Sequence, residues 1–224
     1  MLFNRNELIF GRSIEQPSQE LVKNTLALWN CSVEDALKYG GDLTRAAIGA
    51  MNLRGDRKYI VIDTKVHMLK KGFCPAIPGW HTDGAPRDLA FNPNGSGPPN
   101  IAAQDETNRP PRFHLLVTGM GCMTEFLADR GVEMTPPSVR PYDAYSYMTS
   151  VVNKLMPNKT VLKATSCQVH EFDWWDIHQG TIAEFSEWRF LIRACETDFQ
   201  APQTDLRDII RTQQNVYVPS EFGW

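Results

Sequence analysis

Residues 58–69 of the chain read Lys-Tyr-Ile-Val-Ile-Asp-Thr-Lys-Val-His-Met-Leu. Apolar or β-branched residues recur at every second position, namely Ile60, Ile62, Thr64, Val66 and Met68. This period of two puts them on one face of an extended chain and predicts a β-strand. The strand divides the sequence into an earlier part with helical patterns and a later part in which short strands alternate with turns.

The sequence before this strand favours helices. A first helix can begin at Ser18, with apolar side chains at helical spacing as far as Trp29. A second has Ser32 as its N-cap and ends at a pair of glycines, and Asp42 can cap a third. We therefore expect residues 1–57 to form a helical buttress.

The sequence after the strand favours more strands. We expect them at residues 113–118, 123–127, 160–172 and 188–195, whereas residues 140–155 fit either a helix or a surface excursion. Helices followed by short strands predict a chain that is mainly β with N-terminal helices. We expect its core to span residues 58–195, with residues 196–224 as a C-terminal tail of the same domain.

The composition is that of an ordinary soluble protein. The 224 residues carry 23 Lys and Arg against 26 Asp and Glu, a net charge of −3, which argues against a dedicated nucleic-acid binder. We find neither an apolar run that could span a bilayer nor a signal peptide, and the five cysteines include no Cys-x-x-Cys pair. We therefore expect a cytoplasmic protein with reduced thiols and no membrane partner.

Residues 74–112 stand out because they hold eight of the 15 prolines and four of the 15 glycines. Such a stretch is irregular and longer than an ordinary connection, which is typical of a functional loop. His81 and Asp83 lie near its start, and His178 lies far downstream. Arg189 and Arg193 follow 11 and 15 residues after His178.

These five residues have a chemical rationale. Two imidazoles and one carboxylate can occupy one face of an Fe(II) octahedron and leave three positions open. Residues i and i+2 of an extended chain point to the same side, so His81 and Asp83 can hold one ion together. Arg189 and Arg193 lie on the same face of their predicted strand, and Trp188 lies on the opposite face. A guanidinium can bind a carboxylate through two hydrogen bonds.

Together these residues resemble the Fe(II)/2-oxoglutarate-dependent dioxygenases. The resemblance covers about residues 58–195 and implies a double-stranded β-helix, or jelly-roll, core with N-terminal helices packed on one sheet. It implies that Fe(II) is held by His81, Asp83 and His178. It also implies that the co-substrate 2-oxoglutarate is bound by Arg189, Arg193 and Thr124.

The two arginines have different roles in this resemblance. Arg189 is the better match for the distal carboxylate of 2-oxoglutarate, which puts Arg193 nearer the C1 carboxylate or the substrate. The family often ends this strand with Arg-x-Ser, but here the third residue is Cys195. The division of roles between the two arginines therefore stays open at this point.

The expected activity is that of an oxidoreductase that hydroxylates a small molecule or nucleotide. An alternative is an oxygenase acting on a nucleobase or a protein side chain. Others are a non-catalytic jelly-roll that serves as a structural or binding protein, and a cupin-like metal enzyme that does not use 2-oxoglutarate. The substrate, the oligomeric state and the roles of residues 84–112 and of the tail are open on the sequence alone.

Other residues are weaker candidates. His67, His114 and His170 lack a carboxylate two residues further on, although His114 could contact substrate from an inward strand face. The tail could fold over the site or mediate a dimer through Tyr217 and the aromatic residues after it. We expect three tryptophans near the ligands to fill core or pocket walls, namely Trp80, Trp174 and Trp175.

Overall fold

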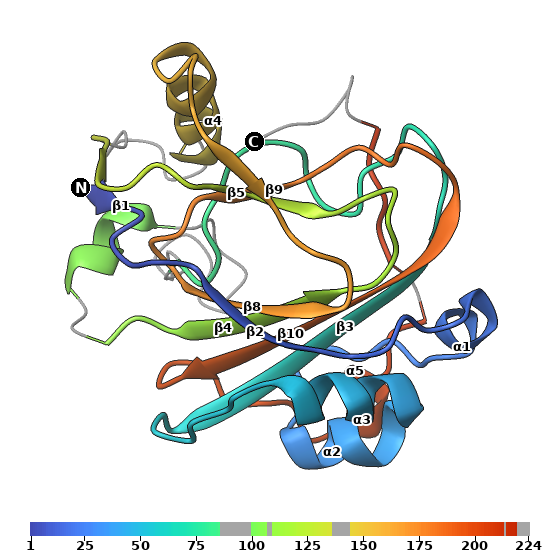
Figure 1. Cartoon of the computed structure of the whole chain (residues 1–224). Helices are drawn as coiled ribbons and strands as arrows, with labels where there is room; N and C mark the ends of the chain where they lie inside the picture. Colours follow the sequence, from blue (N-terminus) through green and yellow to red (C-terminus); the bar gives the residue numbers. More distant parts are fainter. Residues whose placement is uncertain (86–99, 107–108, 136–143, 213, 219–224) are drawn as a thin grey trace.

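The computed structural model describes residues 1–85, 100–106, 109–135, 144–212 and 214–218. Within these residues the protein is mainly β, with three antiparallel sheets and a few short helices (Figure 1). The expected combination of a β-rich chain and N-terminal helices is confirmed. No helix of the described residues is both long and apolar enough to cross a membrane.

The largest sheet has five strands. Their order is β2 (Ile9–Ser13), β8 (Gln168–Asp173), β4 (Arg112–Val117), β10 (Glu187–Thr197) and β3 (Tyr59–Leu69). The predicted strands at 58–69 and 188–195 are confirmed, and they pair with each other along their whole length, from Glu187 opposite Leu69 to Thr197 opposite Tyr59. This long ladder places the side chains of β3 and β10 in matched rows.

Two smaller sheets complete the strands. One consists of β7 (Val161–Lys163), β5 (Thr124–Leu127) and β9 (His178–Gly180), and the other of β1 (Leu2–Phe3) and β6 (Val132–Glu133). The prediction of one strand over residues 160–172 is wrong, because this segment forms β7 and β8 in different sheets. The chain turns between them, and Cys167 has a φ of 63°, which an extended strand does not allow.

The N-terminal helices are α1 (Gln19–Lys23), α2 (Val33–Tyr39) and α3 (Gly41–Ala50). Ser18 and Ser32 cap α1 and α2 as predicted. The first helix is shorter than expected, and Gly40 rather than Asp42 is the N-cap residue of α3. The N-terminal part also contains β1 and β2, which the helical interpretation missed.

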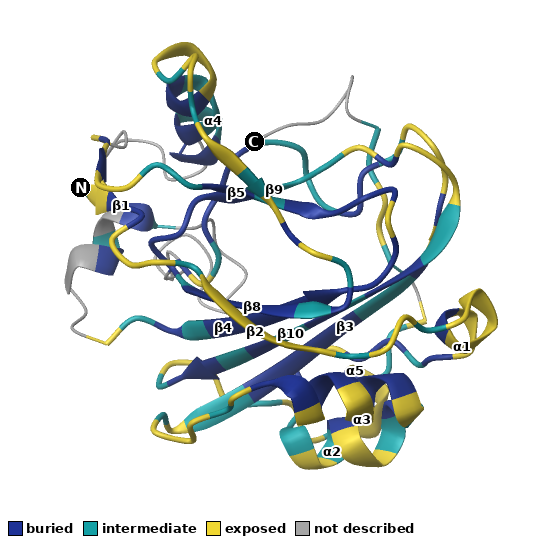
Figure 2. Cartoon of the chain, viewed as in Figure 1, coloured by how far each residue is buried: buried dark blue, intermediate teal, exposed yellow. Residues whose placement is uncertain are grey.

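The helices cover one face of the large sheet (Figures 1 and 2). The apolar rows of β3 and β10 pack there against α2 and α3, with Ile62, Phe190, Ile192 and Ala194 fully buried beside Ala36 and Ala47. Burying these side chains is the main force that holds the helical layer on the sheet. The same alternation turns the other residues of β3 and β10 toward the opposite face.

On that opposite face, a second hydrophobic core lies between the large sheet and the small β7-β5-β9 sheet. Phe113, Leu115 and Val117 of β4 share this core with Phe126 and Leu127 of β5. Of the segment at 140–155 that fitted two interpretations, residues 140–143 lie outside the described residues and the rest is mainly helical. Helix α4 spans Ala144–Lys154 and buries Tyr145, Met148 and Val152 against the same core. The short helices η1 (Ile101–Glu106) and α5 (Leu206–Ile209) complete the described elements.

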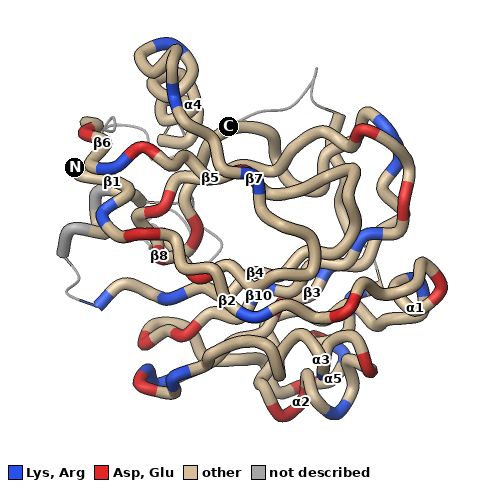
Figure 3. The backbone as a smooth tube through the Cα atoms, viewed as in Figure 1, with Lys and Arg blue, Asp and Glu red and all other residues tan. Residues whose placement is uncertain are grey.

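Charged residues are spread over the molecule. Figure 3 shows Lys and Arg interspersed with Asp and Glu along the helices and connecting segments. The charges that matter for a site are instead inside, on the face of β3 and β10 that is turned away from the helices. Asp63 lies opposite Arg193 and His67 lies opposite Arg189 in this ladder.

Candidate metal centre

The structure brings the three proposed ligand residues together. One ligand atom each from His81, Asp83 and His178 lies within 4.8 Å of the others. The backbones of His81 and His178 form an antiparallel bridge, in which each N–H donates to the other's carbonyl at 2.9 Å. His178 is in turn the first residue of β9, where it pairs with Phe126 of β5. The ligand loop is thereby fixed to the small sheet.

Helix α4 holds the same loop from its other side. The Tyr145 hydroxyl donates to the Thr82 carbonyl at 2.5 Å, and the Thr149 hydroxyl accepts from the Trp80 N–H at 2.8 Å. Trp80 is 1% exposed and its indole N–H donates to Asn153. His81 and Asp83 therefore lie on backbone that is anchored on two sides. The expected filling role of the three tryptophans is confirmed by their burial.

Backbone carbonyls orient both imidazoles. Nδ1 of His81 lies 2.9 Å from the Gly79 carbonyl, and Nδ1 of His178 lies 3.0 Å from the Asp176 carbonyl. Because a carbonyl oxygen only accepts, each ring carries its proton on Nδ1 and its lone pair on Nε2. Metal-ligating histidines are typically fixed in this way, so both rings fit a metal bound through Nε2.

The charges of the site suit a cation. Burial alone would raise the pKa of Asp83, but Arg193, His178 and His81 outweigh it and hold this pKa well below its ordinary value. Burial, together with the neighbouring His178, lowers the pKa of His81 to about 4. Asp83 is therefore charged and His81 neutral at neutral pH, which are the protonation states that a metal requires of its ligands.

Arg193 is engaged with two carboxylates. Its guanidinium donates to Asp83 at 2.6 Å and to Asp63 at 2.9 Å. Burial would lower its pKa, but the two aspartates raise it well above the ordinary value. The resemblance implied that this arginine lies near the C1 carboxylate or the substrate, and the structure places it beside the candidate ligand Asp83.

A cavity of about 240 Å³ borders the three ligands. Arg189 and Thr124, the other residues implied in co-substrate binding, also line it. Arg189 is 1% exposed; its Nε donates to the Cys122 carbonyl at 2.8 Å, and its Nη1 has no hydrogen-bond partner among the described residues. Burial lowers the pKa of Arg189. A buried guanidinium with an unsatisfied donor is costly without a bound anion, so the inner wall fits a carboxylate ligand.

A second cavity, of about 230 Å³, lies on the outer side of the ligands. The two cavities share Lys65, Ala76, His81 and Asp83, so the candidate metal position lies at their junction. Tyr145 of α4 and Tyr217 also line the outer cavity. Tyr217 exchanges two backbone hydrogen bonds with Cys74, each of 2.9 Å, so this residue of the tail lies at the site. Residues 86–99 of the Pro- and Gly-rich stretch, and Phe222 and Trp224 of the tail, lie outside the described residues.

Sequence reasoning missed three polar residues on the inner face of β3, namely Asp63, Lys65 and His67. Both ring nitrogens of His67 lack a hydrogen-bond partner among the described residues, although the ring is 6% exposed. A signal was present in the sequence, because these residues alternate with Ile62, Thr64, Val66 and Met68. Polar residues at a regular period of two in a central strand indicate a polar cavity wall.

The remaining histidines lie away from the ligands. His114 is on the helix-covered side of the sheet, where Nε2 contacts Glu196 at 2.8 Å, so it cannot contact substrate in the cavity. His170 lies in β8, where Nδ1 contacts the Gln168 carbonyl. This agrees with their low rank as candidate ligands.

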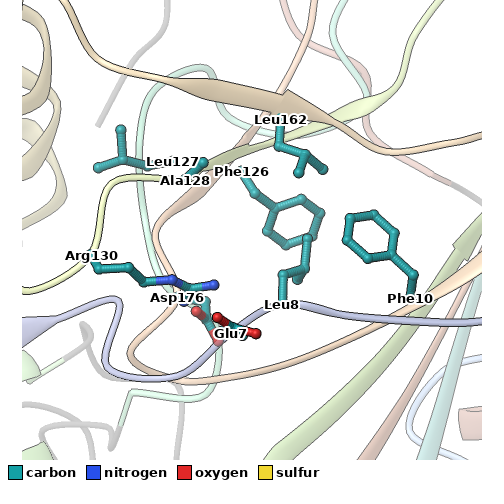
Figure 4. Close-up of a pocket in the computed structure, with 9 residues that line it drawn as sticks. All are labelled: Glu7, Leu8, Phe10, Phe126, Leu127, Ala128, Arg130, Leu162 and Asp176. Atoms are coloured by element: carbon teal, nitrogen blue, oxygen red, sulfur yellow. The ribbon is translucent and has the colours of Figure 1, made fainter.

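Another cavity, of about 200 Å³, lies beyond Phe126 (Figure 4). Glu7, Arg130 and Asp176 gather at one end of it, and Leu8, Phe10 and Leu162 form its apolar part. Of the described residues that line this cavity, none belongs to the His81, Asp83 and His178 group. The Phe126 ring lines this cavity and also packs 5.6 Å from the His178 ring, measured between centroids.

Comparison with protein-family models gives no match, and no curated protein matches the chain. The geometry of the site is therefore what supports a function.

Proposed function

We propose that the protein is an Fe(II)- and 2-oxoglutarate-dependent oxygenase that hydroxylates a small molecule or nucleotide. One observation carries the proposal. A buried group of two histidines and one aspartate shares a cavity with Arg189, a buried guanidinium that forms no ion pair with the described residues. A metal that leaves coordination positions open and a dicarboxylate that spans from the metal to Arg189 would complete both halves of the site.

The proposal includes the fold. Two antiparallel sheets that face each other across a core, with the ligands at one end of the space between them, support a double-stranded β-helix. The free thiols of all five cysteines suit a reducing compartment, so we place the enzyme in the cytoplasm.

The residues of the chain would divide the work as follows. Nε2 of His81, Nε2 of His178 and a carboxylate oxygen of Asp83 would hold the metal. Fe(II), when bound, would activate O₂, the oxidant for hydroxylating a C–H bond, and 2-oxoglutarate would supply two of the electrons by its oxidative decarboxylation. Arg189 would bind the distal carboxylate of the co-substrate, with the Thr124 hydroxyl beside it.

Neighbouring residues keep Asp83 ionised and exclude water from one side of His178. Arg193 holds Asp83 ionised and fixes its orientation. The rings of Phe126 and Phe172 pack against His178, with centroids 5.6 Å and 5.1 Å away, and exclude water from that side. A dry site strengthens the attraction between the metal and its carboxylate ligand.

The test is the visible absorption of the anaerobic protein with Fe(II) and 2-oxoglutarate. Chelation of Fe(II) by the keto acid gives a weak charge-transfer band, which we expect in the wild type and not in His81→Ala. His170→Ala is the matched control, because His170 is a buried histidine of the same core and should leave the band intact. A folded wild-type protein without the band would refute the proposal. Succinate formation then distinguishes this activity from that of a metal enzyme that does not use 2-oxoglutarate.

A further inference from the structure

Lys65 is a partly buried cation at the junction of the two cavities. It lies on the inner face of β3, between Asp63 and His67, and opposite Leu191 of β10. Its side chain lines both the inner cavity, which contains Arg189, and the outer cavity, which contains Tyr145 and Tyr217. It can therefore reach a ligand on the outer side of the metal position.

No carboxylate of the described residues forms an ion pair with this amine. Within them, Nζ of Lys65 meets one acceptor, the Pro75 carbonyl, at 3.4 Å. Burial, followed by the charges of Arg193 and Arg189, lowers the pKa of Lys65 to about 8, and the charge of Asp83 offsets this only in part. An amine held this way between two guanidinium groups gains from any negative charge that enters the cavity.

The charges of the two cavities do not balance without a further anion. Lys65, Arg189 and Arg193 provide three positive charges, while Asp63 and Asp83 provide two negative ones. The dication and the 2-oxoglutarate dianion of the proposed function cancel each other. One positive charge then remains. Arg193 already contacts both aspartates and Arg189 faces the inner cavity, so the remaining charge belongs to Lys65.

We infer that Lys65 is a specificity-determining residue and that the outer cavity accepts a small substrate carrying one carboxylate. This inference rests on the proposed function, since it assigns Arg189 to the co-substrate and Lys65 to the substrate. The single unbalanced charge favours a carboxylate over a phosphate monoester. The outer cavity of about 230 Å³ is smaller than most small-molecule pockets, about 300–1,000 Å³, which favours a small acid over a macromolecule.

The test uses butanoate and its neutral counterpart butanamide as probes. Both are titrated by ligand-observed NMR against the protein loaded with diamagnetic Zn(II) and saturated with 2-oxoglutarate. We expect butanoate to bind at least ten-fold more tightly than butanamide. Lys65→Met should reduce this preference to less than two-fold, Lys65→Arg should keep most of it, and Lys71→Met, which removes an exposed lysine beyond β3, should leave it unchanged.

Three results would overturn the inference: no preference for butanoate in the wild type, a preference that survives in Lys65→Met, or a loss of 2-oxoglutarate binding in Lys65→Met. The last result would assign Lys65 to the co-substrate. Circular dichroism establishes that each variant is folded. If Lys65→Met does not fold, the inference is tested with Lys65→Arg, which should keep most of the preference for butanoate.

The failure of the proposed function has a different signature. It is a missing charge-transfer band in the wild type, with Lys65 intact. In that case the probes are titrated against metal-free protein carrying Arg189→Met, so that the inner wall no longer offers a guanidinium. If butanoate is preferred in this background and Lys65→Met abolishes the preference, Lys65 forms an anion site even without the proposed function. If butanoate is not preferred, the inference of an anion site at Lys65 fails.

Discussion

Arg193 donates a hydrogen bond to Oδ2 of Asp83 at 2.6 Å, and the same oxygen lies 3.6 Å from Nε2 of His178. The carboxylate of the candidate metal ligand is thus held by a residue of β10, although Asp83 itself lies in a loop. Asp63 of β3 accepts from the same guanidinium at 2.9 Å. The ligand group is therefore tied to the longest strand pair of the protein.

Arg193→Met should weaken metal binding about ten-fold at pH 7. The physical reason is that removing a residue that orients a ligand typically lowers metal affinity by about 10- to 100-fold. Calorimetry with Co(II) measures the change. Asp63→Asn is the control, because it alters the other partner of Arg193 and leaves the bond to Asp83; its effect should be smaller. Equal affinities of wild type and Arg193→Met would mean that Asp83 needs no such support.

Arg189→Met should raise the dissociation constant for 2-oxoglutarate about 30-fold and leave metal affinity within about two-fold. A hydrogen-bonded charge pair contributes about 2 kcal/mol, which corresponds to that factor. Calorimetry of the Zn(II)-loaded protein measures the dissociation constant for 2-oxoglutarate, and a Co(II) titration of the metal-free protein measures the metal affinity. Arg45→Met, on the exposed side of α3, should change neither. An unchanged 2-oxoglutarate affinity in Arg189→Met, with a loss in Arg193→Met, would move this role to Arg193.

The two long strands of the fold could be predicted because their sequences carry the alternation on their own. Both β3 and β10 bury one apolar row under the helices, and that row is visible in the sequence. The three residues of β9, His-Gln-Gly, have no such pattern. They are extended because they pair with β5 and because His178 bridges to His81. Pairing between distant segments decides such strands, and local sequence does not record it.

In the candidate site, too, some features could be predicted from the local sequence and others depend on pairing between distant segments. The spacing of His81 and Asp83 predicted that they share one side of the chain. His178 lies far downstream in the sequence, so only the fold brings it beside them. The partner of Arg193 could not be predicted, because Asp63 meets it through the register of β3 and β10. The same register sets His67 opposite Arg189. A sequence shows which residues are polar in a strand, whereas register shows which of them meet.

Glu196→Gln should destabilise the protein by about 3 kcal/mol at pH 7. Glu196 is fully buried and accepts from the N–H groups of Arg54 and Gly55 and from Arg112, and it contacts Nε2 of His114. Burial would raise its pKa, but these contacts, that of His114 foremost, lower it to about 2. A carboxylate with a lowered pKa stabilises the fold above its ordinary pKa of 4.5, and this stabilisation is lost as pH falls toward 2.

Urea unfolding at pH 7 and at pH 3 tests this. The difference between wild type and Glu196→Gln should be large at pH 7 and should shrink at pH 3. Glu184→Gln is the control, since Glu184 is 65% exposed in its pair with Lys163 and should have little effect at either pH. A constant difference between the two pH values would show that the charge of Glu196 does not contribute.

His67→Leu should remove part of the acid sensitivity of the fold. Burial, followed by the charges of Arg189 and Lys65, lowers the pKa of His67 from 6.5 to about 3. The folded protein keeps this ring neutral, whereas the unfolded chain protonates it below pH 6.5. The stability that His67 contributes is therefore complete above pH 6.5 and falls as pH drops from 6.5 toward 3. Leucine has no such transition, and it also replaces two ring nitrogens that lack partners among the described residues with apolar atoms.

Between pH 7.5 and pH 5 the wild type should lose about 2 kcal/mol more of its free energy of unfolding than His67→Leu, because each unit below 6.5 corresponds to about 1.4 kcal/mol. Denaturant titrations at the two pH values give the four free energies. His81 has a lowered pKa as well, but it is present in both proteins and its contribution cancels in the comparison. Met68→Leu, an exposed change next to His67, should retain the wild-type pH dependence. Identical losses in wild type and His67→Leu would mean that the folded protein accepts a charge on His67, and the strongly cationic character of the inner wall would then have to be revised.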